Sequence, residues 1–437
     1  MNLIRNPKFS KQSFCTVQPL MLLGVILLGF GANINAQGLG NSPYSTFGIG
    51  DTYTLGYAAN AGMADVGVST SNGFSVNGIN PALLVRNRVT FFEVGLAGVS
   101  RTLNQTGYEK LRSFGANINN LVFAFPASSR WTLTIGLRPF STVEYKSTLY
   151  RKVPNSIYEG KYSYNGSGGL NRVIFGNGFQ IGKNLNLGVE ASYIFGNIRR
   201  SSETQLLIGD SQDHLVARND RTSVGSLAFK WGAAYRLILK KDQYLNFGAV
   251  ADFKTNLGAK QTSTFEITNL NGLLVANPDT IRDLSGSVTM PAHYRVGLSY
   301  EKWLKLIVSL EYDYQAWSQF RSIDQINQSL ANTSGWHFGV DYIPRINSTK
   351  YFQLVAYRFG INYRNTPYIL NGQNPNDISG SIGFTLPIGK SFGNSMSLGI
   401  TGGTRGTIDN GAVRETYVRF NVGFSLSDRW FVKPKLD

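Results

Sequence analysis

Apolar and polar residues alternate with period two along most of the chain after residue 88. The stretch 185–193 reads Leu-Asn-Leu-Gly-Val-Glu-Ala-Ser-Tyr, and 418–426 reads Val-Arg-Phe-Asn-Val-Gly-Phe-Ser-Leu. Each predicts a long strand with one apolar, often aromatic face and one face of Gly, polar and charged residues. Such strands suit a barrel with lipid outside and a polar lumen inside, whereas a soluble sandwich needs the reverse arrangement.

About fourteen segments follow this pattern, an even number, as single-chain bacterial barrels require. They lie near 89–103, 114–126, 130–145, 160–181, 185–207, 221–239, 244–267, 289–301, 304–319, 335–344, 352–364, 377–388, 395–405 and 414–432. Short, often basic turns alternate with longer polar loops near 146–159, 208–220, 268–288, 320–334 and 365–376. The pattern predicts an all-β, transmembrane, antiparallel up-and-down barrel of about 14 strands, with both ends of the barrel sequence at the periplasmic side.

The first 88 residues do not follow the pattern. Arg5, Lys8 and Lys11 precede an apolar run that ends near Ala36, which predicts a cleaved signal peptide over 1–36, because the run is too short for a membrane anchor. Cleavage lowers the formal net charge from +16 by three, to +13, and removes the single cysteine, Cys15.

Residues 37–88 are rich in Gly, Asn and Ser, and residues 62–84 are compact and irregular, ending at Asn80-Pro81. The composition raises the question whether this segment lies, as a hatch or plug, inside the barrel that 89–437 forms. The alternative is a disordered periplasmic leader. Several charged residues fall at lumen-facing positions and can hydrogen-bond an irregular main chain: Arg138, Lys230, Arg236, Arg295, Arg358, Asp341 and Glu311.

Three motifs resemble the FadL-like family of long-chain fatty-acid transporters, which are outer-membrane channels. They are Asn80-Pro81-Ala82 ahead of the strands, residues 312–320 with Trp-Ser-Gln-Phe at the end, and residues 358–363 followed by Thr366-Pro367. The resemblance implies a hatch that gates the lumen, with Gly62 in its core and Asn80, Pro81 and Ala82 at the junction with the first strand.

The resemblance also implies a lateral exit in the third strand, where an apolar ligand leaves through the wall. Here that strand carries Gly136 and Pro139, and proline cannot donate to the strand ladder. The alternative is a bulge without function. An external apolar groove is implied as well, with Leu270, Leu273, Leu274 and Val275 as its candidates. Packing of this patch against the hatch or another loop is the alternative.

The opening residues 41–51 and the closing residues 429–435 look like FadL-like proteins of Bacteroidota, some of which serve the type IX secretion system. Two functions therefore stay open. One is an uptake channel for hydrophobic or amphipathic, fatty-acid-like molecules. The other is a non-transporting accessory barrel, a plug or shuttle subunit of the type IX protein secretion translocon. The expected partners are outer-membrane lipid or lipopolysaccharide, a hydrophobic ligand, and in the second case a large translocon barrel.

Nothing in the sequence predicts an enzyme, a cofactor or a metal site. The histidines, His214, His293 and His337, lie in a loop and on two separate strands. The Gly-rich residues 402–406 resemble a phosphate loop but lack the strand–loop–helix context. The basic excess suits lipid phosphates at the membrane rim better than nucleic acid. Finally, Ile323, Ile326 and Leu330 have helical spacing and predict a short surface helix.

Overall fold

The computed structural model describes residues 39–428 except 54, 209–213, 270, 327, 370–371, 373 and 390–392. These belong to the compact unit Gln37–Asp437, and the predicted signal peptide lies outside the described residues. Among the described residues, no helix is long and apolar enough to cross a membrane.

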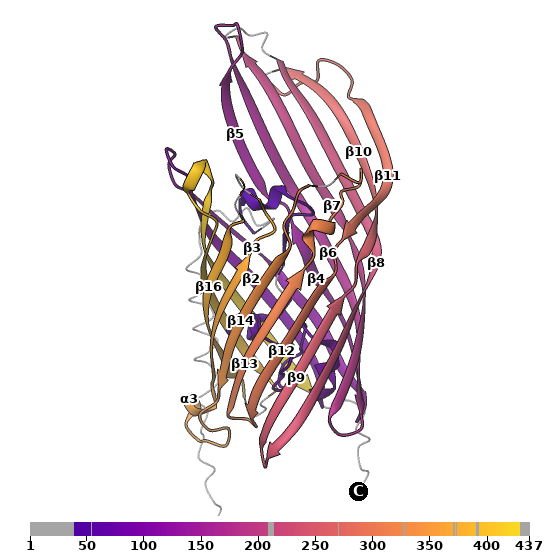
Figure 1. Cartoon of the computed structure of the whole chain (residues 1–437), viewed down its shortest axis with the longest axis vertical. Helices are drawn as coiled ribbons and strands as arrows, with labels where there is room; N and C mark the ends of the chain where they lie inside the picture. Colours follow the sequence, from indigo (N-terminus) through magenta and orange to yellow (C-terminus); the bar gives the residue numbers. More distant parts are fainter. Residues whose placement is uncertain are drawn as a thin grey trace, which may run out of the picture. The chain divides into compact units, whose positions relative to one another are not determined.

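Antiparallel strands form one sheet that closes on itself where β18 pairs with β2 (Figure 1). The strands are β2 Thr90–Asn104, β3 Leu111–Ser128, β4 Trp131–Thr142, β5 Tyr145–Lys152, β6 Glu159–Ile181, β7 Leu185–Leu207, β8 His214–Lys240, β9 Gln243–Asp252, β10 Thr255–Asn269, β11 Asp279–Met290, β12 His293–Lys302, β13 Leu306–Gln315, β14 Thr333–Tyr342, β15 Ala356–Asn365, β16 Asn376–Pro387, β17 Ser395–Arg405 and β18 Arg414–Asp428. The pairs β4–β5, β9–β10 and β11–β12 are each one barrel strand interrupted by two residues. These 17 strands therefore make 14 continuous barrel strands, which we call staves. The predicted fourteen-stranded barrel is confirmed.

The wall has the polarity of a membrane barrel. On β7, Leu187 and Tyr193 point outward and are 39% and 48% exposed, whereas Glu190 and Ser192 point into the lumen and are buried. Connections of two or three residues join β3 to β4, β6 to β7, β8 to β9 and β12 to β13 at one end of the barrel. Short connections mark the periplasmic end, and we use that name for it.

At the opposite, outer end, the structure corrects the predicted loops. Much of 146–159, 208–220 and 268–288 is strand, and β5, β6, β7, β8, β10 and β11 continue as a polar sheet above the other staves (Figure 1). Neither face of this sheet is apolar, so hydrophobic alternation could not predict it. Main-chain hydrogen bonds between neighbouring strands hold it instead.

The predicted helix near 323–330 is wrong, because the described residues there form turns and irregular chain. Ile323 and Leu330 are nevertheless buried in an apolar cluster inside the outer half of the barrel, while Ile326 is exposed. The spacing therefore identified two buried side chains but the wrong main-chain conformation.

Residues 39–88, which we call the N-terminal segment, run inside the ring of strands (Figure 1). Its elements are η1 Pro43–Thr46, β1 Asp51–Thr52, α2 Ala58–Ala61 and η2 Pro81–Arg86; the remaining short helices are η3 Trp317–Gln319, α3 Tyr351–Leu354 and η4 Asp409–Gly411. We call residues 39–53 the arm.

Lumen-facing glycines let the N-terminal segment lie directly against the wall. A Cβ on Gly188 would stand 2.3 Å from the Ala82 nitrogen, and one on Gly360 would stand 2.3 Å from the Ala64 nitrogen. Main-chain atoms of the segment would also lie 2.1–3.1 Å from a Cβ on Gly178, Gly248, Gly339, Gly383 or Gly399, whereas a Cβ on Gly232 or Gly423 would meet side-chain atoms of the segment. The high glycine content thus has a structural use, because only glycine leaves room for a second main chain at these positions.

We predict that Gly188→Val displaces the N-terminal segment, because valine suits a strand but its side chain meets the main chain at Pro81 and Ala82. Overpacking of this kind costs about 1–3 kcal/mol, which denaturant unfolding of the reconstituted barrel would measure. Limited proteolysis should also cleave the N-terminal segment faster. The matched control is Gly402→Val, where a Cβ meets nothing within 4 Å. Equal stability of the two variants would contradict the packing argument.

Candidate functional site

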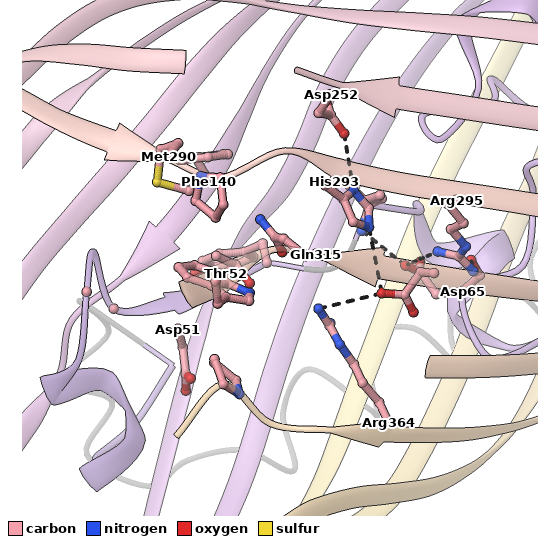
Figure 2. Close-up of a pocket in the computed structure, with 18 of the residues that line it drawn as sticks. Asp51, Thr52, Asp65, Phe140, Asp252, Met290, His293, Arg295, Gln315 and Arg364 are labelled. Atoms are coloured by element: carbon pink, nitrogen blue, oxygen red, sulfur yellow. Dashed lines mark hydrogen bonds and ion pairs between the residues drawn. The ribbon is translucent and has the colours of Figure 1, made fainter. Parts of the chain in front are cut away.

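A cavity of about 290 Å³ lies between the N-terminal segment and the outer half of the wall. Its apolar part comes from the cluster buried there, including Ile194, Leu257, Met290 and Trp317. Its other part carries charged side chains, among them His293 (Figure 2). Two cavities lined partly by residues 59–77 and by periplasmic-end residues measure only about 20 and 30 Å³. The larger cavity therefore offers an apolar surface and a charged surface to one occupant.

The first charged feature is a pair of arginines on neighbouring strands. Arg138 on β4 and Arg172 on β6 stand directly opposite each other in the register, an arrangement that like charges disfavour. Arg138 donates to the carbonyls of Leu55 (2.6 Å) and Gly78 (3.5 Å) in the N-terminal segment. Arg172 is 6% exposed and lines the cavity. Its guanidinium carbon lies 5.7 Å from the centre of the Phe140 ring, a cation–π contact.

Arg172 makes no hydrogen bond or ion pair with any other described residue, and its Nε is buried without an acceptor. A buried guanidinium without a paired carboxylate is costly, because no counter-charge in direct contact offsets its lost hydration, although Asp252 acts on it electrostatically from farther away. An anionic group in the cavity would supply that counter-charge.

Lys230 on β8 adds a second buried cation, 1% exposed. Its Nζ lies 3.6 Å from Glu190 Oε1, an ion pair too long for a hydrogen bond, and it has no hydrogen-bond acceptor among the described residues. Asp252 stands opposite Lys230 on β9. Lys230 therefore has its charge balanced but retains hydrogen-bonding capacity toward the cavity it lines.

Around Asp313, buried and half-buried side chains form a connected network, of which Figure 2 labels His293, Asp252 and Arg364. His293 lies between Asp252, at 3.2 Å, and Asp313, at 3.7 Å. His337 contacts Asp313 at 2.8 Å and the carbonyl of Ala64 in the N-terminal segment at 3.0 Å. Both histidines are thus held by carboxylates, and His337 is also held by main chain. Neither is hydrogen-bonded to a serine among the described residues, so the geometry offers no nucleophile–base pair of the serine hydrolase kind.

The arm is anchored near the outer end by a buried ion-pair network. Asp51 lies 3.0 Å from Arg405 and 3.3 Å from Arg101, and both arginines also contact Glu415. Ser42 donates to Glu415 at 2.7 Å. Burial raises the pKa of Asp51, but the charges of Arg405 and Arg101 outweigh it and hold that pKa well below its usual range. The arm therefore stays ion-paired throughout the ordinary pH range.

The structure places the sequence-predicted hatch residues against the wall. Gly62 lies where a Cβ would be 2.6 Å from the Cα of Gly383. The Asn80 side chain accepts from the Ala82 nitrogen at 3.0 Å and so caps η2, which Pro81 begins. Asn80 Nδ2 also donates to the Val68 carbonyl at 2.7 Å. These residues fix the turn between the segment and the first strand.

Gly136 and Pro139 lie where the ladder between β3 and β4 ends. The last pair is Leu121 with Leu137, and Leu111–Asn120 of β3 have partners on β2 but none on β4 or β5. Gly136 points inward, and a Cβ at this position would lie 2.8 Å from the Val122 side chain. Pro139 lines the cavity beside a register shift between β4 and β6. The third stave is therefore separated from β3 in the outer half of the wall.

The arm occupies this separation. Asp51 and Thr52 pair with Thr142 and Ser141 of β4, in the position that β3 leaves. Nearer the N-terminus, the Gly40 nitrogen donates to Glu144 at 3.0 Å, and a Cβ on Gly40 would meet Ser113 of β3 at 3.1 Å.

The external apolar patch stays apart from these features. Leu273, Leu274 and Val275 are 65%, 54% and 53% exposed in the connection between β10 and β11, and none of them lines the cavity. Leu270 lies outside the described residues. The packing against the N-terminal segment considered from the sequence is not seen for the three described residues.

Sequence reasoning identified the inward-facing charges Arg138, Lys230, Arg295, Arg358, Asp341 and Glu311, which are all buried here. It missed Arg172 and the Asp313 network. Alternation does place these residues on the luminal face, but only the register shows that Arg172 faces another arginine, and only the side-chain contacts show that Asp313 lies between two histidines.

Solved structures of similar fold include a hydrocarbon channel, a toluene transporter and a FadL homologue. The CymD monoaromatic hydrocarbon channel superposes with a TM-score of 0.57 at 14% identity, over 86% of this chain and 99% of that one. The toluene transporter TodX of P. putida gives 0.55 at 16% identity, over 87% and 100%. A Pseudomonas aeruginosa FadL homologue gives 0.54 at 14%, over 86% and 98%. The likeness confirms the predicted FadL-type barrel fold.

At the level of sequence, no curated protein matches this chain. A family model does, over residues 20–437, and that family is described as BamG. The match spans nearly the whole chain, so the chain belongs to the BamG family.

Proposed function

We propose that this protein is an outer-membrane channel for small amphipathic molecules with an anionic, carboxylate-like head. The observation that carries the proposal is Arg172, a buried guanidinium that lines the cavity without a carboxylate partner among the described residues. A ligand carboxylate between Arg172 and Lys230 would satisfy both cations, as charge-assisted hydrogen bonds do elsewhere.

The apolar side of the cavity favours an aliphatic or aromatic body on the same ligand. Trp317, Met290 and Leu257 belong to the buried apolar cluster and line the cavity opposite the charged part. A volume of about 290 Å³ suits a molecule of fatty-acid-like chemistry with a short chain. The names of the similar structures refer to toluene and monoaromatic hydrocarbons, which are apolar and lack such a head.

Release into the membrane through the wall beside Pro139 is the second part of the proposal. The ladder between β3 and β4 is missing there, so no main-chain hydrogen bonds of the wall need to break. The arm fills the separation through Gly40, Ser42 and β1, and we assign it the role of gate. The rest of the N-terminal segment, held by wall glycines and by contacts such as Glu311 with the nitrogens of Gly67 and Val68, acts as the fixed hatch.

An accessory role in a type IX protein secretion translocon is the second candidate. The polar sheet above the barrel favours it, because this sheet has two open edges at its outer end, along β5 and β11. Strand edges with unpaired main-chain groups bind other chains by adding a strand. In this role the barrel binds a larger partner and the cavity needs no ligand.

We predict that octanoate binds the purified barrel in lipid nanodiscs and that Arg172→Met weakens this binding. Loss of one charge-assisted contact removes about 1.5–3 kcal/mol, or roughly 10- to 150-fold in Kd. Equilibrium dialysis with labelled octanoate measures the effect, and octanol, which lacks the charge, should bind both proteins alike. Arg199→Met, an exposed arginine outside the cavity, is the control. Unchanged octanoate affinity in Arg172→Met would refute the anionic-head assignment.

For the gate, we predict that tying the arm to β5 blocks uptake. Asn41 accepts from the Lys146 nitrogen at 3.2 Å, so Asn41→Cys with Lys146→Cys places two thiols at this contact, and the only native cysteine lies in the predicted signal peptide. Bismaleimide-treated cells should take up octanoate slowly, while untreated cells and cells with Asn41→Cys alone should not change. Equal uptake in all three would rule out gating by the arm.

The two functions differ in which proteins co-purify with the native barrel and in whether protein secretion depends on it. The channel predicts an isolated barrel in affinity purification from native membranes, with protein secretion unaffected by Arg172→Met. The accessory role predicts a large barrel protein in the same purification and a secretion defect when residues of the β5 edge are replaced by proline. Mass spectrometry of the purified material and of the culture medium distinguishes them.

A further inference from the structure

The positive charge of the chain gathers at the periplasmic end of the barrel. The connections there and the strand ends beside them carry nine basic residues among the described positions: Arg88, Arg130, Lys183, Lys240, Lys241, Lys302, Lys305, Arg345 and Lys350. The same positions carry two acidic residues, Asp242 and Asp428. We call the nine residues the basic rim.

All nine side chains of the basic rim are exposed, and none has an ion-pair partner among the described residues. At the outer end, Lys260 pairs with Asp283 at 3.1 Å and Arg218 pairs with Asp220 at 3.2 Å, while other exposed basic side chains there, such as Lys110 and Arg414, have no ion-pair partner among the described residues. Within the described part of the chain, the rim is thus a ring of positive charge without ion-pair partners, and it extends over six separate connections around the barrel, including the one before β2.

Aromatic side chains lie next to the basic rim on the lipid-facing side. Trp131, at the start of β4, is 38% exposed and stacks on Phe179. The Phe179 ring is 39% exposed. Such rings mark the boundary between hydrocarbon and headgroups. The long side chains of the rim can therefore extend from this boundary toward headgroup phosphates.

The helix α3 strengthens this placement. It lies at the periplasmic end and to the side of the barrel (Figure 1), directly after Lys350. Its Phe352 is 76% exposed and its Tyr351 46% exposed. An exposed aromatic pair beside a lysine is typical of a segment that lies in the interface of a membrane.

We propose that the basic rim binds anionic glycerophospholipids of the inner leaflet of the outer membrane and so forms a selective lipid shell. The occupant follows from the position of the charges. They lie at the level of the headgroups, beside lipid-facing aromatics, and they encircle the barrel instead of forming one patch that a single protein partner would cover. Anionic headgroups supply the missing counter-charge. Salt screens the attraction between each headgroup phosphate and the basic side chains, as it does for surface ion pairs.

The test uses the full-length mature barrel in nanodiscs that contain equal amounts of phosphatidylglycerol and phosphatidylcholine. After mild detergent extraction, native mass spectrometry counts the lipids that stay bound. We expect several-fold enrichment of phosphatidylglycerol, which falls as salt rises. A variant with Lys183, Lys240, Lys241, Lys302 and Lys305 all changed to Gln should lose the enrichment.

The matched control neutralises five exposed basic residues of the outer end: Lys110, Arg112, Arg151, Lys152 and Arg414, each changed to Gln. It should keep the enrichment. Equal retention of the two lipids by the wild type, or equal loss in both variants, would overturn the proposal. Binding to purified peptidoglycan that the rim variant loses, with phosphatidylglycerol enrichment unchanged, would assign the rim to the cell wall and also overturn it. Because the rim lies outside the cavity, octanoate binding provides a separate check that both variants fold.

Discussion

Main-chain hydrogen bonding is the constraint on which the rest of this structure depends. A polypeptide in a membrane must satisfy every N–H and C=O internally, and a closed strand ladder does so for the wall. The N-terminal segment has little regular structure and must satisfy its own groups inside the lumen. Luminal glycines allow the two main chains to approach, and buried side chains such as Glu311 and Arg138 then bond the segment directly.

The lumen is consequently divided by chemistry. At the level of the N-terminal segment it is filled by charges that pair with the segment or with one another, as Arg295 does with Glu311 and Asp65. Toward the outer end lies an apolar cluster that includes Tyr44 and Ile49 of the arm, and side chains of both kinds line the cavity. Arg172 stands out because it belongs to the charged zone but has no acceptor among the described residues. That mismatch is the reason to expect an anionic occupant there.

Strand pairing in the wall is interrupted at one place, and the arm lies at that place. Strand β3 leaves β4 after Leu137, and β1 of the arm takes the place beside Thr142. The arm thus takes the place of a strand neighbour along this part of β4. Farther out, β5 and β11 do have open edges, but they lie in a polar sheet above the lipid-facing belt, where water can satisfy them.

The sequence by itself determined the class of fold, the fourteen staves and the polarity of the wall, because lipid outside and a polar lumen inside impose a period of two on every stave. It also marked Asn80-Pro81 as the junction, since proline limits the local main chain. It did not show the polar strands above the membrane, whose two faces are alike, or the chain near Ile323, where helical spacing reflected burial alone. Register was decided only by the tertiary structure. A charge on a strand has no partner until its neighbours are aligned, and that alignment set Arg138 against Arg172, Asp313 between His293 and His337, and the arm into the separation beside Pro139.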